Sequence, residues 1–256
     1  MDFEMMCQKE GWVKKSEVKL RKKSDRSSED FIHLIKTIEY PCENRISYTT
    51  TGITSTNTEF ESSSSAICVS LIEEINKVGF SISSIDWKTR VLDMGTRLHN
   101  AWSVRTKRHN GSMIPHVEEL FSIISKDSGY HYSTSFNGIL SKVKNKSFQD
   151  RNIYDIEDTF KAILLNIDDF CIITIGLNTK LVWLGRDQNY YIFDPEGNQR
   201  VNSEDDMFYL STNDIKNLVT IFLSLYYNEK HEEEPHSNIN GFQAFKVWKT
   251  NMSDRK

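Results

Sequence analysis

The spacing of apolar residues changes along the chain from a helical period to a strand period. Between residues 66 and 124 apolar positions recur every two to four residues, which is typical of helices that bury one face. Helices are predicted over residues 66–78, 84–102 and 115–124, and a short apolar segment predicts another over 160–167. The serines at 62–65 precede the first helix as possible N-caps, and Pro115 suits the first turn of the third.

From residue 170 onward, short runs of β-branched and aromatic residues alternate with polar segments. Strands are predicted over 170–176, 181–184 and 190–193, and residues 177–180 and 186–189 are predicted to form the turns of an antiparallel meander. A further helix over 211–225 and a last strand over 242–248 complete the pattern. Because the helices come first and the strands follow, the predicted fold class is α+β.

The segment before residue 66 is polar and predicts little buried structure. Residues 47–65 are dominated by Ser and Thr, and we expect a strand over 45–51 and then a loop. We divide the chain into a basic, partly flexible extension (1–50), an α+β domain (51–250) and a tail (251–256). The extension carries a basic run, made of Lys14, Lys15, Lys19, Arg21, Lys22, Lys23 and Arg26. Its favoured interpretation is a solvated tail or helix face, and the alternative is a nuclear-import or anion-binding patch that would be the one route to nucleic acid.

Composition excludes several classes of function. The 256 residues suffice for a sizeable core, and 32 Lys and Arg against 36 Asp and Glu give a net charge of −4, so no overall basic field demands nucleic acid. No apolar run approaches the roughly 20 residues needed to span a bilayer, and the N-terminus does not resemble a signal peptide. We expect an intracellular protein, cytoplasmic or, if the basic run directs import, nuclear.

Neither a metal nor a cofactor is predicted. The four cysteines are scattered without a Cys-x-x-Cys pair, which indicates reduced thiols in place of a zinc site or a disulfide framework. Two histidines, His231 and His236, flank a Glu-rich segment that could bind a metal loosely, but such a charged stretch is ordinarily a solvated loop.

Cys68 opens an apolar segment and is a candidate nucleophile. A cysteine attacks as the thiolate, and because a free thiol has a pKa near ~8.5 it needs help at neutral pH. The predicted helix places Cys68 in its first turn, where the free amides and the dipole favour negative charge. The alternative is a small buried hydrophobe, which helix context alone favours. Cys171 lies in the middle of a predicted strand and is assigned to the core.

Three motifs in order resemble a known family. Cys68 at a helix start is followed by Leu92-Asp93-Met94-Gly95-Thr96-Arg97-Leu98-His99, and the meander ends in Phe193-Asp194-Pro195-Glu196-Gly197. This set is similar to the ubiquitin-specific cysteine proteases at the N-terminus of herpesvirus large tegument proteins, over roughly residues 55 to 250. The resemblance implies a papain-like fold.

The same resemblance implies roles for individual residues. Cys68 matches the nucleophile and Asp194 the acid that orients the catalytic imidazole, whereas Glu196 stands where the family has that histidine. The family also uses an upstream Gln as an oxyanion donor. No Gln stands in the corresponding stretch here, and Asn57 is the weak candidate for that role.

Glu196 argues against catalysis. An exposed Glu has a pKa near ~4.3 and is an anion at pH 7, so beside Cys68 it would raise the thiol pKa. Nor does a carboxylate offer the paired donor and acceptor with which imidazole takes a proton and returns it to the leaving amine. Loss of the base typically costs on the order of 10⁴-fold or more. We therefore expect a catalytically degenerate, deubiquitinase-like domain that binds ubiquitin or another protein partner.

Two alternatives remain open. In the first, the chain is an active cysteine protease or deubiquitinase whose Cys68 is served by a histidine from elsewhere, since such units are defined by geometry and not by sequence position. The histidines that could serve are His33, His99, His109, His116, His131, His231 and His236. In the second, the chain is an unrelated α+β interaction domain without activity, and residues 193–197 are merely a strand and a tight turn.

Overall fold

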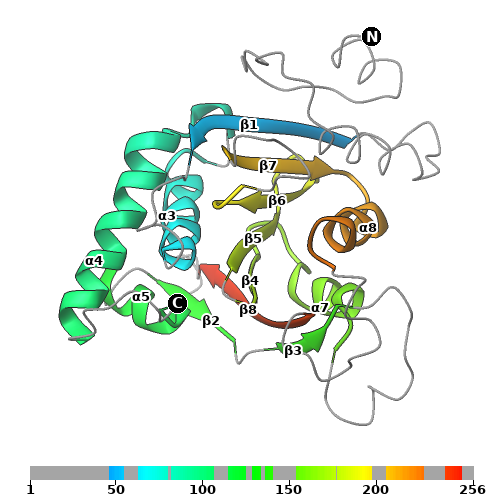
Figure 1. Cartoon of the computed structure of the whole chain (residues 1–256). Helices are drawn as coiled ribbons and strands as arrows, with labels where there is room; N and C mark the ends of the chain where they lie inside the picture. Colours follow the sequence, from blue (N-terminus) through cyan, green and yellow to red (C-terminus); the bar gives the residue numbers. More distant parts are fainter. Residues whose placement is uncertain are drawn as a thin grey trace, which may run out of the picture.

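The computed structural model (Figure 1) describes residues 46–54, 63–79, 82–106, 115–124, 129–133, 136–140, 154–176, 178–197, 206–227 and 240–249. These residues form one mixed structure of helices packed on a large antiparallel sheet, so the predicted α+β class is confirmed. Asn57, the basic run and residues 251–256 lie outside the described residues.

The sheet has eight strands, and its main path runs in the order β1-β7-β6-β5-β4-β8-β2, with β3 also paired to β8. Every pairing between these strands is antiparallel. The strands are β1 (Ile46–Thr54), β2 (Tyr130–Tyr132), β3 (Phe136–Ile139), β4 (Phe170–Ile175), β5 (Asn178–Leu184), β6 (Tyr190–Asp194), β7 (Asp206–Thr212) and β8 (Gly241–Lys249). The predicted meander is therefore the centre of the sheet, formed by β4, β5 and β6.

Helices cover both faces of the sheet (Figure 1). They are α3 (Ser64–Lys77), α4 (Met94–Thr106), α5 (Val117–Ile124), α7 (Ile156–Ile163) and α8 (Ile215–Tyr226), with a 3-10 turn at Ile82–Ser84 and a π-helical segment η2 at Trp87–Asp93. One hydrophobic core joins α3, α4 and α5 to one face, and a second joins α7 and α8 to the other. Alternate residues of β5 enter opposite cores, Leu181 and Trp183 on the α3 face and Val182 on the α8 face.

Helix α3 is the central helix of the first face. Its apolar residues Ile67, Leu71, Ile72 and Ile75 follow a helical period and are at most 1% exposed. The helix begins at Ser64, with Ser63 at the N-cap position, so Cys68 is its fifth residue. Cys68 therefore lies in the second turn, and the expectation that it lies in the first turn is wrong.

A close helix crossing explains the glycine of the second sequence motif. Segment η2 runs directly into α4, where a single helix had been predicted, and α4 packs against α3. A Cβ added to Gly95 would lie 2.7 Å from the Cα of Ile67. Such a distance is too short for any side chain, so only glycine allows the two helices to approach this closely.

Several predicted boundaries are wrong. Residues 178–180, predicted as a turn, are the first residues of β5. Residues 211 and 212 belong to β7, so α8 begins only at Ile215, after an Asp214 cap. Helix α7 begins at Ile156, four residues before the predicted start, because Asp155 caps it by accepting from the Asp158 N–H. Strands β2, β3 and β7 were not predicted at all.

The first strand crosses the boundary drawn between residues 50 and 51, because β1 extends from Ile46 to Thr54 and pairs with β7. The division into extension, domain and tail otherwise stays a prediction. Among the described helices, none has the length and apolar character to cross a bilayer.

Candidate active site

A buried ion pair joins the start of β5 to the end of β6. Leu181 pairs with Phe193 in this antiparallel ladder, which places the preceding residue Lys180 opposite the following residue Asp194. The Lys180 ammonium nitrogen lies 2.6 Å from Oδ1 of Asp194, and the two side chains are only 3% and 1% exposed. Burial lowers the pKa of Lys180, but Asp194 and Glu196 outweigh that effect and raise it overall, so the amine stays protonated.

Both carboxylate oxygens of Asp194 have protein partners. Oδ1 accepts from Lys180 and, at 3.0 Å, from the backbone N–H of Glu196, while Oδ2 accepts from the Tyr226 hydroxyl of α8 at 2.9 Å. An acid that orients an imidazole needs a free oxygen lobe directed at that ring. In this site three of the roughly four acceptor positions of the Asp194 carboxylate are taken by an ammonium, a backbone amide and a phenol.

Glu196 lies just beyond β6 and is mostly buried. Its side chain is 16% exposed, and Oε2 lies 3.4 Å from the Lys180 ammonium. Burial raises the pKa of Glu196 above its ordinary value of 4.5, and Asp194 raises it further, whereas Lys180 and the hydroxyl of Ser64 lower it. One lysine is thus shared by two carboxylates.

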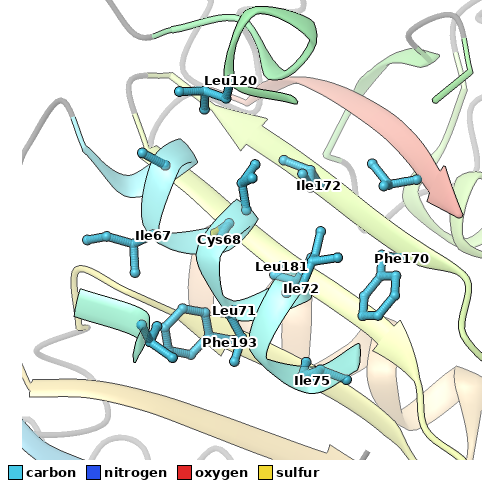
Figure 2. Close-up of a cluster of buried hydrophobic side chains, with 14 of the residues drawn as sticks. Ile67, Cys68, Leu71, Ile72, Ile75, Leu120, Phe170, Ile172, Leu181 and Phe193 are labelled. Atoms are coloured by element: carbon cyan, nitrogen blue, oxygen red, sulfur yellow. The ribbon is translucent and has the colours of Figure 1, made fainter. Parts of the chain in front are cut away.

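The thiol of Cys68 is enclosed in the core on the α3 face (Figure 2). Cys68 is 0% exposed, and Figure 2 shows it among Ile67, Leu71, Leu181 and other apolar side chains. Its Sγ lies 3.7 Å from the carbonyl oxygen of Thr179, a weak thiol hydrogen bond. Burial raises the pKa of the Cys68 thiol well above its ordinary range, and the nearby Lys180 offsets this only in part.

Serines in the first turn of α3 contact the start of β5. The backbone N–H of Thr179 donates to Oγ of Ser64 at 3.2 Å, and the hydroxyls of Ser65 and Thr179 lie 2.8 Å apart. Ser64 also lies close enough to the Glu196 side chain to lower the pKa of that carboxyl. The start of α3 is therefore joined to the start of β5 through Ser64 and Ser65, and β5 is joined to the end of β6 through Lys180.

The described histidines lie apart from this point. His99 packs against Trp102 within α4 with the rings tilted, His131 stacks on Trp248 at the sheet edge, and His116 is exposed before α5. The charged groups that shift the Cys68 pKa are Lys180, Asp194 and Glu196. His33, His109, His231 and His236 lie outside the described residues, as does Asn57. Within the described ranges, no group of three or more His, Cys, Asp or Glu side chains is placed to hold a metal ion.

The structure brings together Cys68, Asp194 and Glu196, and it adds Lys180, Tyr226 and Ser64, which the sequence analysis did not select. The sequence analysis did not select Lys180 because its segment was predicted to be a turn, and side chains alternate between two faces only in a strand. The signal that could have found it is the two-residue period shared by Lys180, Val182 and Leu184 once β5 is extended backward. Tyr226 carries no such signal, because its partner is 32 residues away.

The antiparallel sheet, the helix α3 that begins beside β5 and the acid at the end of β6 define the fold as a papain-like α+β fold. No model of a known protein family matches the sequence, and no curated protein matches it. Among solved structures, the chain is similar to the ubiquitin-specific protease encoded by murine cytomegalovirus tegument protein M48, determined in complex with a ubiquitin-based suicide substrate. The TM-score is 0.58 with 17% sequence identity, over 80% of this chain and 86% of that one.

Proposed function

We propose that this chain is a catalytically silent, deubiquitinase-like domain that acts by binding ubiquitin or another protein partner. The observation that carries the proposal is the Lys180–Asp194 ion pair, because it occupies the acid that a catalytic imidazole would require. Lys180 is no substitute base: its raised pKa keeps it protonated at neutral pH.

Ubiquitin is the first partner to test because the similar viral protease was captured with a ubiquitin-based substrate. The shared fold supports a shared binding surface, while the altered charges near Cys68 support a loss of cleavage. Binding without turnover is therefore the function that fits both observations. It also requires no cofactor.

The test exposes the full chain to ubiquitin that carries a C-terminal electrophile, and follows adduct formation by mass spectrometry. We expect no adduct with the wild-type chain, and chemical-shift changes in isotope-labelled ubiquitin when the chain is added. An adduct that disappears in Cys68→Ala would show an active thiol protease and overturn the silent assignment. If ubiquitin neither reacts nor shifts, the ubiquitin part of the proposal fails and another protein partner must be sought.

A further inference from the structure

We infer that the outer face of α4 is a docking surface for an acidic, amphipathic helix of another protein. The inference goes beyond the proposed function, because it assigns a second surface and a second kind of partner. Helix α4 lies on the outside of the molecule, and α3 lies between it and the sheet (Figure 1). The exposure, the spacing and the charge of the side chains on the outer face carry the inference.

Apolar side chains on the outer face of α4 form a row along the helix. Val104 is 70% exposed, more than any other large apolar side chain of the described residues, and Met94 is 40% exposed. Ala101 lies between them and is exposed as well. Positions 94, 101 and 104 follow the seven- and three-residue intervals of a helical seam, so Met94, Ala101 and Val104 share one side of α4. Such an apolar row is what the apolar face of a second helix covers.

The inner face of α4 holds this apolar row in a fixed position. Gly95 allows α4 to lie directly against the backbone of Ile67 in α3. The Trp102 indole, which is only 2% exposed, donates to Oε2 of Glu119 in α5 at 2.8 Å. Because α4 is anchored to two other helices, it can bind a partner without ordering itself first, which lowers the entropic cost of binding.

The surface of η2 and α4 is positively charged, although the whole chain carries a net charge of −4. Residues 87–106 contain four basic residues and one acidic residue, Asp93, which gives this segment a charge of +3. The basic residues are all exposed, and they are Lys88, Arg90, Arg97 and Arg105. None of these four forms an ion pair with another described residue. The charge of this face is therefore complementary to an acidic partner.

Arg97 favours a protein helix over a lipid surface as the partner. It stands within the apolar row, between Met94 and Ala101, so any partner that covers the row also removes the guanidinium from water. Hydrocarbon offers a guanidinium no hydrogen-bond acceptor, and burial of an unpaired charge is costly. A carboxylate on a partner helix can accept two parallel hydrogen bonds from Arg97. The face thus fits a helix that carries Glu or Asp beside its apolar side chains.

The test measures binding of the full chain to a designed peptide. The fluorescein-labelled probe has about three heptads, with Leu in its apolar row, one Glu within that row and Glu at the flanking positions. Binding is followed by fluorescence anisotropy at low ionic strength, and the control peptide carries Lys in place of every Glu. We expect the acidic peptide to bind at least about tenfold more tightly than the basic one, because like charges repel on this face. Equal binding of the two peptides, or no binding of the acidic one, would overturn the inference.

Two pairs of variants test the location of the surface. Val104→Asp should weaken binding of the acidic peptide about tenfold or more, whereas Leu165→Asp, at a residue that is 67% exposed outside α4, should leave it unchanged. Arg97→Glu should weaken binding similarly, whereas Lys216→Glu makes the same charge change at an exposed position of α8 and should have no effect. All four positions are exposed, so the variants should keep the fold, which circular dichroism checks. Equal losses of binding within a pair would refute the assignment to α4.

Vesicles of phosphatidylcholine and phosphatidylserine distinguish a helix from a membrane as the partner. We expect co-sedimentation of the chain with these vesicles to be the same for the wild type and Val104→Asp. Vesicle binding that is lost in Val104→Asp would assign the face to lipid and contradict the inference. None of these measurements contains ubiquitin, so their failure is distinguishable from a failure of the ubiquitin-binding proposal.

Discussion

Replacing Lys180 with methionine should strongly destabilise the protein. Methionine matches the length of the lysine stem, but it leaves Asp194, which is 0% exposed, without its cation. Removing one partner of a buried ion pair typically costs 3–5 kcal/mol, roughly a third or more of the free energy of unfolding of an ordinary domain. For a chain of this size about 1 kcal/mol shifts the melting temperature by 2–4 °C, so a decrease of about 6–20 °C is expected.

The assay is chemical and thermal unfolding followed by circular dichroism, with Lys161→Met as the matched control. Lys161 forms an ion pair with Glu157 on the surface of α7, where charge pairs contribute little, so this variant should unfold at the wild-type midpoint. In Lys180→Met/Asp194→Asn the unpaired charge is gone, and part of the lost stability should return. A Lys180→Met variant within about 1 kcal/mol of wild type would refute the claim that Asp194 depends on this cation.

Three further predictions concern neighbouring contacts. Tyr226→Phe removes the hydroxyl that donates to Asp194 and should cost about 1.5–3 kcal/mol in chemical unfolding, the range for hydrogen bonds to charged groups. Gly95→Ala should destabilise by about 1–3 kcal/mol in the same assay, because the new methyl group would clash with the backbone of Ile67. Glu196→Gln should change the pH dependence of unfolding. The pKa of Glu196 is raised above 4.5 in the folded state, so the folded chain binds a proton at this carboxylate more readily than the unfolded chain does. The wild type should therefore gain stability relative to the variant as the pH falls from neutral toward 4.5.

Each of these predictions has a control or a contrary outcome. Tyr132→Phe alters an exposed tyrosine, 43% accessible, and should leave stability within about 0.5 kcal/mol of wild type. Asn100→Ala, at an exposed position of the same helix as Gly95, should be neutral or slightly stabilising. If Glu196→Gln and wild type keep a constant difference in unfolding free energy between pH 7 and pH 4.5, the raised pKa of Glu196 is disproved.

The sequence was sufficient for most of the helices and for the central meander, because apolar periodicity depends on local residues, and the resemblance of the motif around Asp194 to a known family implied the papain-like class. The prediction from the sequence was wrong at the start of β5. Asn178, Thr179 and Lys180 are polar and locally favour a turn, but in the fold Thr179 and Lys180 are satisfied by partners such as Ser64 and Asp194. Local propensity is overridden there by tertiary hydrogen bonds and an ion pair.

The prediction that Cys68 lies in the first turn of its helix was wrong for a related reason. Four consecutive serines at 62–65 are equally good N-caps by residue type, so the sequence does not specify at which of them α3 begins. A shift of two residues in the helix start moves Cys68 from the first turn into the second, where its side chain lies in the core. The start is set by the contacts of Ser64 and Ser65 with Thr179, more than a hundred residues away in the sequence.

The buried cluster of Lys180, Asp194 and Glu196 also constrains how the chain can change by mutation. A single substitution of Glu196 with histidine would place an imidazole beside a protonated lysine, and like charge would oppose formation of the imidazolium that catalysis requires. A single loss of Lys180 would leave Asp194 buried without a counter-ion. Under the proposed function, each single substitution toward protease chemistry therefore gives a less stable or still inactive protein, so the three residues together hold the chain in its proposed silent state.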